Sequence, residues 1–306
     1  MKYFSPEKCI VCENQYSGHG WNRECTKKYL FRDGDIALEA GYFEHYLDSV
    51  FVKTVIELPT SYGCPSKCKF CASSNIPGFY PLQPEEMMAL FQSLYNAHQP
   101  RKKGPLLVSM TGIGDLFFNT RNVLDFLQLL SAYEGIQVTL SSCLWNRALL
   151  EQVTQLEPQS MIRKLQVTFV SDKPDILKDM IPVYADRPPN LREVIRFIKT
   201  SDKTYYRINY VLMKGINDAS DDFQRLCDAL AEVKDKVIVR ISKLNETGAT
   251  QRNHLSRADD GKAEELQKLL SSSGINSYVF CSKKNDHMNC GQLVTECPSP
   301  ASNSSR

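Results

Sequence analysis

From about residue 52 onward, short β-rich runs alternate with longer amphipathic segments, and this alternation constrains the fold more than any other feature. The expected strands are 52–60, 106–111, 137–142, 165–170, 206–213 and 237–244. The expected helices are 83–97, 120–133, 146–155, 191–199, 220–233 and 259–273. Strands that alternate with helices pair in parallel, because each helix returns the chain to the same end of the sheet. We therefore expect an α/β fold, a partial (β/α)6 barrel whose chemistry lies at the C-terminal ends of its strands.

The alternation also divides the chain into three parts. Residues 1–50 lack it, and we expect them to form a separate, small Cys-rich N-terminal extension. Residues 51–297 form the expected barrel, which includes a short β run near 277–280, and residues 298–306 are expected to be a disordered tail. With 306 residues, of which 42% are hydrophobic, the chain has enough apolar material for a sizeable core.

The charge of the chain bears on its partners. Thirty-seven Lys and Arg against 35 Asp and Glu leave a net charge of +2, which gives no bulk attraction to nucleic acid or membrane. The N-terminus carries no apolar secretory signal, and no run of about 18 apolar residues could span a bilayer. We therefore expect a cytoplasmic protein, in which the 11 cysteines serve as metal ligands or reactive thiols rather than disulfides.

Three cysteines, Cys64, Cys68 and Cys71, follow the first expected strand in a loop that contains Gly63 and Pro65. Because a loop has no helical or strand register, these closely spaced thiols can converge on one inorganic site. A cubane iron–sulfur cluster normally takes four cysteine ligands, so three leave one iron open to an exogenous ligand. The same spacing also fits a zinc site completed by a distant residue, or three unrelated buried thiols.

This Cys-x3-Cys-x2-Cys loop, with the aromatic Phe70 before its last cysteine, resembles the signature of the radical SAM superfamily. The resemblance implies a [4Fe-4S] cluster on Cys64, Cys68 and Cys71, whose open iron binds the amino and carboxylate groups of S-adenosylmethionine (SAM). Reduction would then cleave SAM and release a 5′-deoxyadenosyl radical that abstracts hydrogen. The cofactor supplies this chemistry, and the protein holds SAM and substrate in an oriented site that excludes water.

Further segments resemble one branch of that superfamily, the RlmN/Cfr-type RNA adenine methyltransferases. Gly114 and Asp115 match the end of a Gly-Met-Gly-Glu-Pro segment, which implies that they hold the SAM amino group. Ser141 and Thr168 match strand-end positions and could hydrogen-bond the SAM ribose or carboxylate, and Asn245 matches an Asn that contacts adenosine. On the residues alone, these positions equally fit a glycine turn, strand-end hydroxyls and a turn former.

Near the C-terminus, the run that begins at Cys290 resembles that branch's Cys-Gly-Gln-Leu, whose cysteine accepts a methyl group from one SAM. The radical from a second SAM then takes a hydrogen from this methyl, and the carbon radical adds to an adenine ring carbon. The resemblance makes Cys290 the expected methyl carrier, a role that suits a nucleophilic sulfur. The alternative is a small buried thiol that closes the barrel.

Two departures from this branch affect the expected reaction. The branch resolves its protein–RNA adduct with a second cysteine seven residues before the first cluster cysteine, and this chain has Glu57 there. A carboxylate cannot form the disulfide that releases the product. Cys143, at the end of the third expected strand, is the one candidate for a substitute thiol, and a buried core cysteine is the competing interpretation. The branch also carries a helical RNA-binding domain where this chain has about fifty unrelated residues.

Those N-terminal residues contain Cys9, Cys12, His19 and Cys25, whose spacing is typical of a small zinc module with four ligands. Zinc would stabilise a segment that is too short to form its own core. A redox Cys-x2-Cys pair and unliganded thiols are the alternatives.

The sequence thus predicts a radical SAM enzyme that performs methyl or one-carbon transfer through Cys290 on RNA or a nucleotide-like substrate. One alternative is direct hydrogen abstraction from a small molecule or peptide, without methyl transfer. Another is a non-catalytic iron–sulfur or zinc binding protein. Both enzyme interpretations require an electron donor, such as a reductase or a flavodoxin-type protein.

Overall fold

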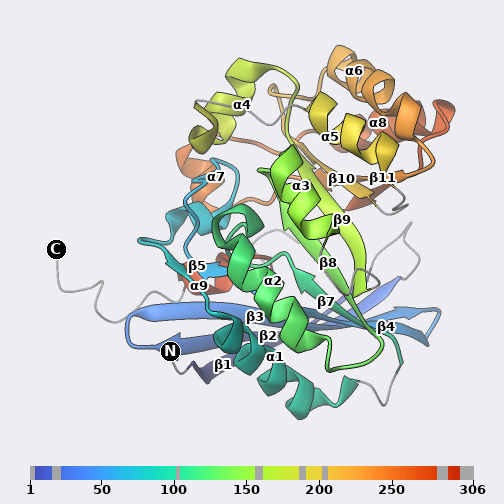
Figure 1. Ribbon diagram of the computed structural model, residues 1–306. Coiled ribbons are helices and arrows are strands. Elements are labelled where there is room, and N and C mark those ends of the chain that lie inside the picture. The colour runs from blue at the N-terminus through green and yellow to red at the C-terminus, as the bar shows by residue number, and fades with distance from the viewer. Residues whose placement is uncertain are drawn as a thin grey trace.

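The computed structural model describes residues 4–15, 22–100, 104–155, 161–185, 191–201, 206–280 and 289–296. Within these residues ten strands form one sheet, and β5 (Ser61–Tyr62) pairs with β6 (Tyr80–Pro81) apart from it. The strands of the large sheet, in spatial order, are β1 (Ser5–Gln15), β2 (Arg23–Asp33), β3 (Ile36–Leu47), β4 (Val50–Glu57), β7 (Leu106–Met110), β8 (Ile136–Ser142), β9 (Ile162–Phe169), β10 (Tyr206–Leu212), β11 (Val237–Lys243) and β12 (Ser277–Phe280) (Figure 1).

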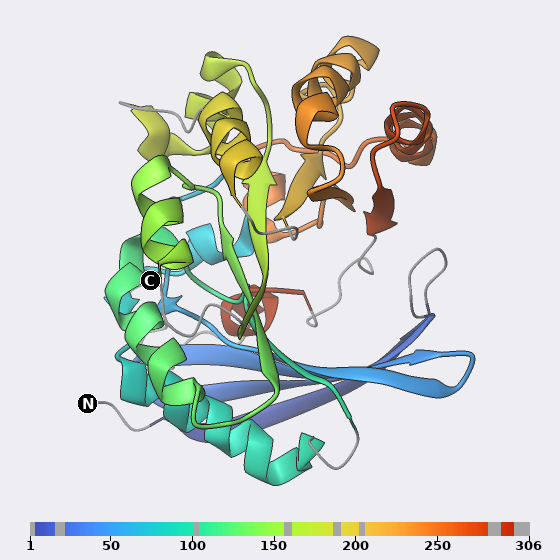
Figure 2. The ribbon, with the colours of Figure 1, turned by 45° about the vertical axis from the view of Figure 1, so that its right-hand side comes forward.

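In the large sheet, β4, β7, β8, β9, β10, β11 and β12 all run parallel. This confirms the predicted α/β fold. Each of the six predicted strands is present, and the short β run at the end joins them as β12. The sheet curls. The N-terminal strands cross the lower part of Figure 2, and β8 and β9 rise steeply from them. The C-terminal ends of the parallel strands, where the chemistry is expected, therefore lie at one end of a curved wall.

The six predicted helices are present, and their apolar residues form one core with the sheet. They are α1 (Pro84–His98), α2 (Thr120–Leu130), α3 (Arg147–Thr154), α5 (Leu191–Thr200), α6 (Ser220–Leu230) and α8 (Asp260–Ser272). Three short helices were not predicted, because fewer than three turns carry too little periodicity: α4 (Pro174–Met180), α7 (Gly248–Arg252) and α9 (Gln292–Glu296). No helix in the described ranges is both long and apolar enough to cross a bilayer.

Short 3₁₀ helices complete the connections between these elements. They are η1 (Ala72–Asn75), η3 (Leu116–Asn119), η5 (Pro182–Ala185) and η6 (Ala231–Val233). The first follows the cysteine loop directly, and the second precedes α2. Both therefore lie at the C-terminal ends of parallel strands.

The two faces of the parallel strands differ in character because side chains alternate along a strand. On β9, Leu165, Val167 and Phe169 belong to the core that the helices cover, and Lys164, Gln166 and Thr168 alternate with them. We call the face opposite the helices the inner face. Its polar residues in the described strands include Lys53, Glu57, Ser109, Ser141, Lys164, Gln166, Thr168, Arg207, Asn209, Arg240 and Ser242.

The N-terminal strands are not a separate element, contrary to the expectation from the sequence. β1, β2 and β3 pair antiparallel in turn, and β3 pairs antiparallel with β4 from Gly41 opposite Glu57 to Leu47 opposite Val50. Antiparallel neighbours need only short turns, so no helices separate them and the alternation of the barrel is absent. The N-terminal residues thereby extend the barrel sheet, and residues 298–306 lie outside the described part of the chain.

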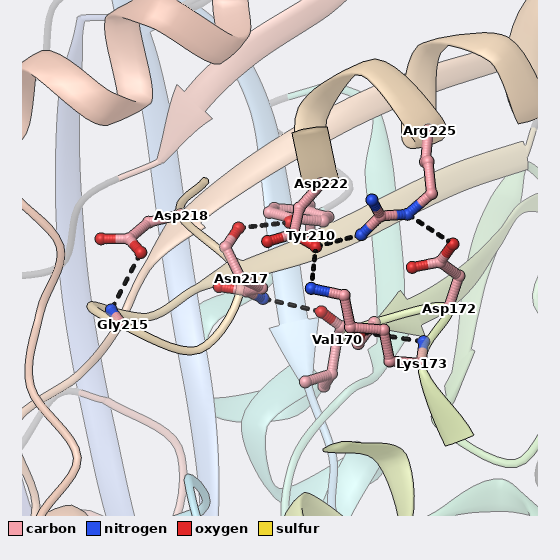
Figure 3. A network of polar contacts seen from close by, with 10 residues as sticks. Val170, Asp172, Lys173, Tyr210, Gly215, Asn217, Asp218, Asp222 and Arg225 are labelled. Carbon is pink, nitrogen blue, oxygen red and sulfur yellow. Dashed lines mark hydrogen bonds and ion pairs between the residues drawn. The ribbon is translucent and has the colours of Figure 1, made fainter. Parts of the chain in front are cut away.

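A buried asparagine fastens the C-terminal ends of β9 and β10 (Figure 3). The Asn217 side chain donates hydrogen bonds to the carbonyl oxygens of Val170 (2.7 Å) and Val211 (2.8 Å), and it accepts one from the backbone N–H of Met213 (2.8 Å). The hydroxyl of Tyr210 donates to the Asn217 carbonyl at 2.6 Å. The run 210–218, which resembles the methyltransferase branch in sequence, is thus a structural turn.

Replacing this asparagine should destabilise the protein. Asn217→Ala removes three buried hydrogen bonds and leaves backbone groups unsatisfied, so we expect a loss of about 2–3 kcal/mol in the free energy of unfolding. Urea unfolding followed by circular dichroism measures it, with the exposed Asn276→Ala as the matched control. Equal unfolding midpoints for the two variants would show that the turn does not depend on Asn217.

Candidate functional site

The cysteine loop connects β5 to η1, just beyond the C-terminal end of β4. Gly63 has φ of 66°, and a Cβ there would lie 2.2 Å from the carbonyl oxygen of Gly78, so only glycine fits. The Lys67 ammonium donates to the Ile76 carbonyl at 3.0 Å, and the Lys69 N–H donates to the Met180 carbonyl at 2.9 Å. The loop is therefore held at both ends and in its middle.

The three thiols of this loop are close enough to influence one another. Cys64 and Cys68 are buried. Burial, and to a smaller extent the neighbouring thiols and Asp115, raise the pKa of Cys64 to about 12 and that of Cys71 to about 11. The thiolates would thus be unfavourable without a cationic partner.

Whether this loop suits an inorganic group depends on its donors and surroundings. No group of three His, Cys, Asp or Glu side chains in the described residues is close enough to hold a single metal ion. A cubane cluster spans several atoms and does not need its ligands that close, and three soft thiols in an apolar setting match its chemistry. Phe70, Cys68 and Cys71 belong to such an apolar cluster with Leu144 and Val170. The residues therefore fit an iron–sulfur cluster.

Asp115 lies beside the thiols and connects β7 to the end of β8. Its carboxylate accepts hydrogen bonds from the Ser142 hydroxyl (2.5 Å), the Cys143 N–H (2.8 Å) and the Phe117 N–H (2.9 Å). Burial raises the pKa of Asp115, and these hydrogen bonds oppose the increase. Much of its accepting capacity is already used within the protein. That it also holds the amino group of SAM stays a prediction.

The glycines before Asp115 allow backbone segments to pack closely. A Cβ on Gly114, which has φ of 101°, would lie 2.2 Å from the Thr60 hydroxyl and 2.3 Å from the Ser61 hydroxyl. The Asn119 amide then donates to the carbonyls of Thr60 and Leu82, both at 2.8 Å. Gly114 therefore lets this loop pack on the end of β4, and its expected contact with SAM stays a prediction.

The other predicted SAM contacts lie near strand ends but are spread over three strands. The Ser141 hydroxyl accepts a hydrogen bond from the Gln166 amide at 3.0 Å. Thr168 lines a cavity of about 20 Å³ with Cys143, which is room for about one water molecule. Asn245 is half-buried two residues after β11. Their contacts with SAM remain predictions.

Cys290 is held over the cysteine loop by a buried ion pair from the N-terminal strands. The Lys28 ammonium lies 2.7 Å from the Glu39 carboxylate and donates to the Asn289 carbonyl at 2.6 Å. Glu39 accepts hydrogen bonds from the N–H groups of Gly291 and, at 3.2 Å, Val294. The backbone on both sides of Cys290 is therefore tied to β2 and β3.

The residues after Cys290 also have structural reasons to be there. Gly291 has φ of 78°, and a Cβ there would lie 3.0 Å from the hydroxyl of Ser73 in η1. The Gln292 amide donates to the Glu246 carbonyl at 3.2 Å, and Leu293 is fully buried beside Ile76. This packing places Cys290 against the segment that follows Cys71.

Carboxylates dominate the electrostatic environment of Cys290. Burial raises the pKa of its thiol well above the ordinary value, Glu57 and Glu39 raise it further, and Lys28 opposes them. Glu57, the residue in place of the resolving cysteine, accepts a hydrogen bond from the Thr111 hydroxyl at 2.9 Å. Burial also raises the pKa of Glu57. The site thus favours a neutral thiol and attracts positive charge.

Lys28 and Glu39 were missed in the sequence. The signal for Glu39 was a lone acidic residue in the otherwise apolar run Ile36–Gly41. Such a residue in a buried strand needs a partner. The identity of that partner could not be read, because it depends on strand register.

Cys143 lies beside the cysteine loop. Its sulfur is 3.9 Å from the sulfur of Cys68 and 3.8 Å from the hydroxyl of Ser66. The groups that act on Cys290 are Glu57, Glu39, Lys28 and Cys71. The structure therefore gives no support to Cys143 as a thiol that substitutes for Glu57.

The described N-terminal cysteines do not converge on a zinc site, which corrects the expectation from their spacing. Cys9 pairs with Tyr29 and Cys12 with Thr26, so the two thiols point to opposite faces of β1. Cys25 pairs with Glu13, four residues along β2 from the partner of Cys9. His19 lies outside the described residues. The Cys-x2-Cys spacing suits a loop, whereas here it falls in a strand.

A cavity of about 710 Å³ lies on the opposite side of the sheet, between α4, α5 and α6. Its apolar lining includes Phe169, Leu191 and Ile195. Asp172, Asp222 and Arg225 of the ion-pair network in Figure 3 line it as well. The sheet separates this cavity from the inner face, so it is not the site of the cysteine chemistry.

Comparisons with known proteins show which sequences and folds this chain resembles. No family model matches the chain. It is 24% identical over 279 residues to a probable dual-specificity RNA methyltransferase RlmN of Streptococcus agalactiae serotype V, covering 88% of this chain and 73% of that protein. It is also 24% identical over 283 residues to the corresponding protein of Streptococcus thermophilus, covering 89% and 70%.

Solved structures show the same fold. A crystal structure of a radical SAM methyltransferase from Sphaerobacter thermophilus has a TM-score of 0.73 and 20% identity, covering 94% of this chain and 80% of that one. A structure of TYW1 with a lysine-pyruvate adduct bound has a TM-score of 0.51 and 15% identity, covering 71% and 73%. The chain has the radical SAM fold. It is an enzyme with an RlmN-like relationship within that class.

Breaking the buried ion pair should be more harmful than neutralising both partners. Lys28→Met leaves the Glu39 carboxylate buried without its counter-charge, which typically costs about 3–5 kcal/mol of folding free energy. Adding Glu39→Gln removes that charge and keeps an oxygen for the N–H groups of Gly291 and Val294, so part of the loss should return. Urea unfolding of the wild type, both single variants and the double variant measures the coupling. Additive losses would contradict a direct ion pair.

Proposed function

We propose that this enzyme cleaves SAM reductively at a [4Fe-4S] cluster and transfers a methyl or one-carbon group through Cys290 to RNA or a nucleotide-like substrate. The observation that carries the proposal is the position of Cys290, held by Lys28 and Glu39 against the segment that follows the cysteine loop. Cys64, Cys68 and Cys71 would hold the cluster. When bound, the cluster and SAM supply a methyl donor and a 5′-deoxyadenosyl radical.

The charge around Cys290 supports the methyl-transfer step. Glu57 and Glu39 outnumber Lys28, so the surroundings attract a cationic sulfonium and disfavour a free thiolate. Transfer of a methyl group from the sulfonium of SAM would form the S–CH3 bond, release S-adenosylhomocysteine and free the thiol proton. The resulting thioether is neutral and carries no such penalty. Burial of Cys290 therefore favours reaction only when a positively charged donor is present.

Asp115, Ser141, Thr168 and Asn245 are the residues that we propose to contact SAM beside the cluster. All four lie at or near the C-terminal ends of strands, where an α/β barrel binds its ligands. Phe70 is proposed to pack against the cluster. Gly114 would contribute through the position of its loop.

Glu57 favours a second candidate function. A carboxylate cannot resolve a thioether adduct by forming a disulfide. Among the described groups that act on Cys290, the thiol is that of Cys71, which is proposed as a cluster ligand and would not be free to replace it. The second candidate is direct hydrogen abstraction from a small molecule or peptide, with Cys290 as a hydrogen donor or a structural thiol. Both candidates share the cluster and SAM, and they differ in whether Cys290 is methylated.

Both candidates need a reductant, and we propose a reductase or a flavodoxin-type protein of the cytoplasm for this role. RNA and nucleotide-like molecules remain the proposed substrate classes. A net charge of +2 supports a small substrate over a large structured RNA, because a large RNA is held through many phosphate contacts.

The cysteine loop should account for the colour of the protein. After anaerobic reconstitution with iron and sulfide, we expect the wild type to be brown. Its broad visible absorption band should lie at about 400 nm, as in other [4Fe-4S] proteins. The Cys64→Ala, Cys68→Ala, Cys71→Ala triple variant should lose the colour and about four iron atoms per chain. Cys227→Ala, a buried cysteine in α6, is the matched control. An iron content in the triple variant equal to that of the wild type would contradict the cluster assignment.

Methyl-labelled SAM separates the two candidate functions. With dithionite, the reconstituted wild type should form S-adenosylhomocysteine and 5′-deoxyadenosine, and the label should appear on the peptide that contains Cys290. Cys290→Ser should still form 5′-deoxyadenosine but carry no label, since an alcohol is a much weaker nucleophile than a thiol. Mass spectrometry of the nucleosides and peptides measures both.

Two outcomes would reject the methyl-carrier assignment. In the first, the wild type forms 5′-deoxyadenosine alone and Cys290 stays unmodified, which favours direct hydrogen abstraction. In the second, Cys290→Ser retains the label at another residue. If neither nucleoside forms in a brown protein, both candidate functions fail together.

A further inference from the structure

Three basic side chains meet on the inner face of the sheet, away from the cysteine loop. Lys53 lies on β4, Lys164 on β9 and Arg207 on β10. Arg207 pairs in register with Gln166, which is two residues from Lys164 on the same face of β9. Lys53 acts electrostatically on Lys164 although two strands, β7 and β8, separate β4 from β9, because the sheet curls (Figure 2). We call Lys53, Lys164 and Arg207 the inner basic cluster.

This cluster has little counter-charge in the part of the chain that the structure describes. Among the described residues, neither Lys53 nor Lys164 forms an ion pair or donates a hydrogen bond. The carboxylate that acts on Lys53 belongs to Glu24, which is already bound to His45 at 2.8 Å and to the Thr26 hydroxyl at 2.8 Å. Two half-buried lysines on the inner face therefore lack a carboxylate at ion-pair distance among the described residues.

Arg207 is also incompletely satisfied. One of its terminal nitrogens donates to the Gln166 side-chain oxygen at 3.0 Å, but its buried Nε–H has no partner in the described structure. A guanidinium uses its N–H groups as a fork that grips two oxygens of one anion. An unpartnered Nε–H next to two ammonium groups is the arrangement that such an anion would complete.

Burial and neighbouring cations lower the pKa values of both lysines. Burial first, and then the charges of Arg207, Lys53 and Arg163, lower the pKa of Lys164 to about 7. Burial and the charges of Arg207 and Arg163 also lower the pKa of Lys53, and Glu24 opposes them. Crowding these cations costs folding free energy that a bound anion would offset.

We propose that the inner basic cluster binds the phosphate group of a small nucleotide-like substrate. A phosphate offers several oxygens to the Arg207 fork and to the two ammonium groups, and charge-assisted hydrogen bonds of this kind are strong. The proposal goes beyond the proposed function because it assigns residues that recognise the substrate. It rests on that function for the substrate class, a nucleotide-like molecule.

Position argues for a small ligand rather than an RNA chain. Glu57, which acts on Cys290, follows Lys53 by four residues on β4, so the two ends of the site are about 13 Å apart at 3.3 Å per residue. A nucleotide can span this distance with its base near Cys290 and its phosphate at the cluster. The cations lie on the inner wall of the curled sheet, which one terminal phosphate can reach more easily than a folded RNA.

Binding of defined probes to the full chain tests this site without any radical chemistry. Isothermal titration calorimetry at pH 8 would use inorganic pyrophosphate, AMP, adenosine and a short RNA without a terminal phosphate. We expect AMP and pyrophosphate to bind and compete, and adenosine to bind at least 10-fold more weakly than AMP. Lys164→Gln and Arg207→Gln should each weaken AMP at least 10-fold, as expected for losing a charged hydrogen bond.

Two controls make the result specific to the cluster. Lys268→Gln removes the same charge from the exposed side of α8 and should bind AMP like the wild type. AMP binding should take up protons in buffers of different ionisation enthalpy, because the phosphate holds Lys164 protonated, and Lys164→Gln should abolish the uptake. Lys164→Gln should also melt no lower than the wild type, since it relieves repulsion between cations.

Three results would overturn the assignment. One is equal binding of AMP to the wild type and to both cluster variants. Another is binding of the RNA, but not of AMP, that depends on Lys164 and Arg207, which would assign the cluster to an RNA chain. The third is no binding of either phosphate probe at millimolar concentration. Because none of these readouts involves SAM, a failed methyl transfer with intact AMP binding would reject the proposed function and leave the site standing.

Discussion

The buried ion pair between Lys28 and Glu39 is the interaction on which the arrangement of the site depends. Both side chains are almost completely removed from solvent, with exposures of 0% and 1%. Burying two charges is costly unless every donor and acceptor finds a partner. Here Lys28 and Glu39 also form hydrogen bonds with backbone groups around Cys290. These bonds hold the N-terminal strands and the C-terminal segment together. A thiol that is over 200 residues from the cysteine loop in sequence is thereby fixed next to it.

The two faces of the sheet differ in chemical character. The outer face is apolar and is covered by the helices, and the cavity on that side is lined in part by ion-paired side chains. The inner face carries polar side chains at alternate positions, with carboxylates near Cys290 and cations farther along the strands. This division creates a gradient of charge along the wall. The proposed methyl donor, a cation, and the proposed phosphate group, an anion, match its two ends.

Much of the fold followed from the sequence because periodicity is a local property. The six strands and the longer helices were predicted within a few residues, and the cysteine loop was found where it is expected in a barrel. The zinc expectation failed because Cys9 and Cys12 fall in a strand, where a spacing of three puts them on opposite faces. The missing Cβ of Gly114 makes room for Thr60 and Ser61, a packing role that depends on neighbours distant in sequence, and its contact with SAM stays a prediction. The zinc error comes from reading a loop pattern without its neighbours.

The sequence by itself determined the class of fold, the cysteine loop and the identity of the residue in place of the resolving cysteine. These depend on side-chain order and spacing along the chain. Only the tertiary structure decided that the N-terminal strands extend the barrel sheet, that Lys28 and Glu39 secure Cys290, and that Cys143 lies beside Cys68. Only it could bring Lys53, Lys164 and Arg207 together, because residues on different strands meet through register and curvature, which spacing in one chain does not encode.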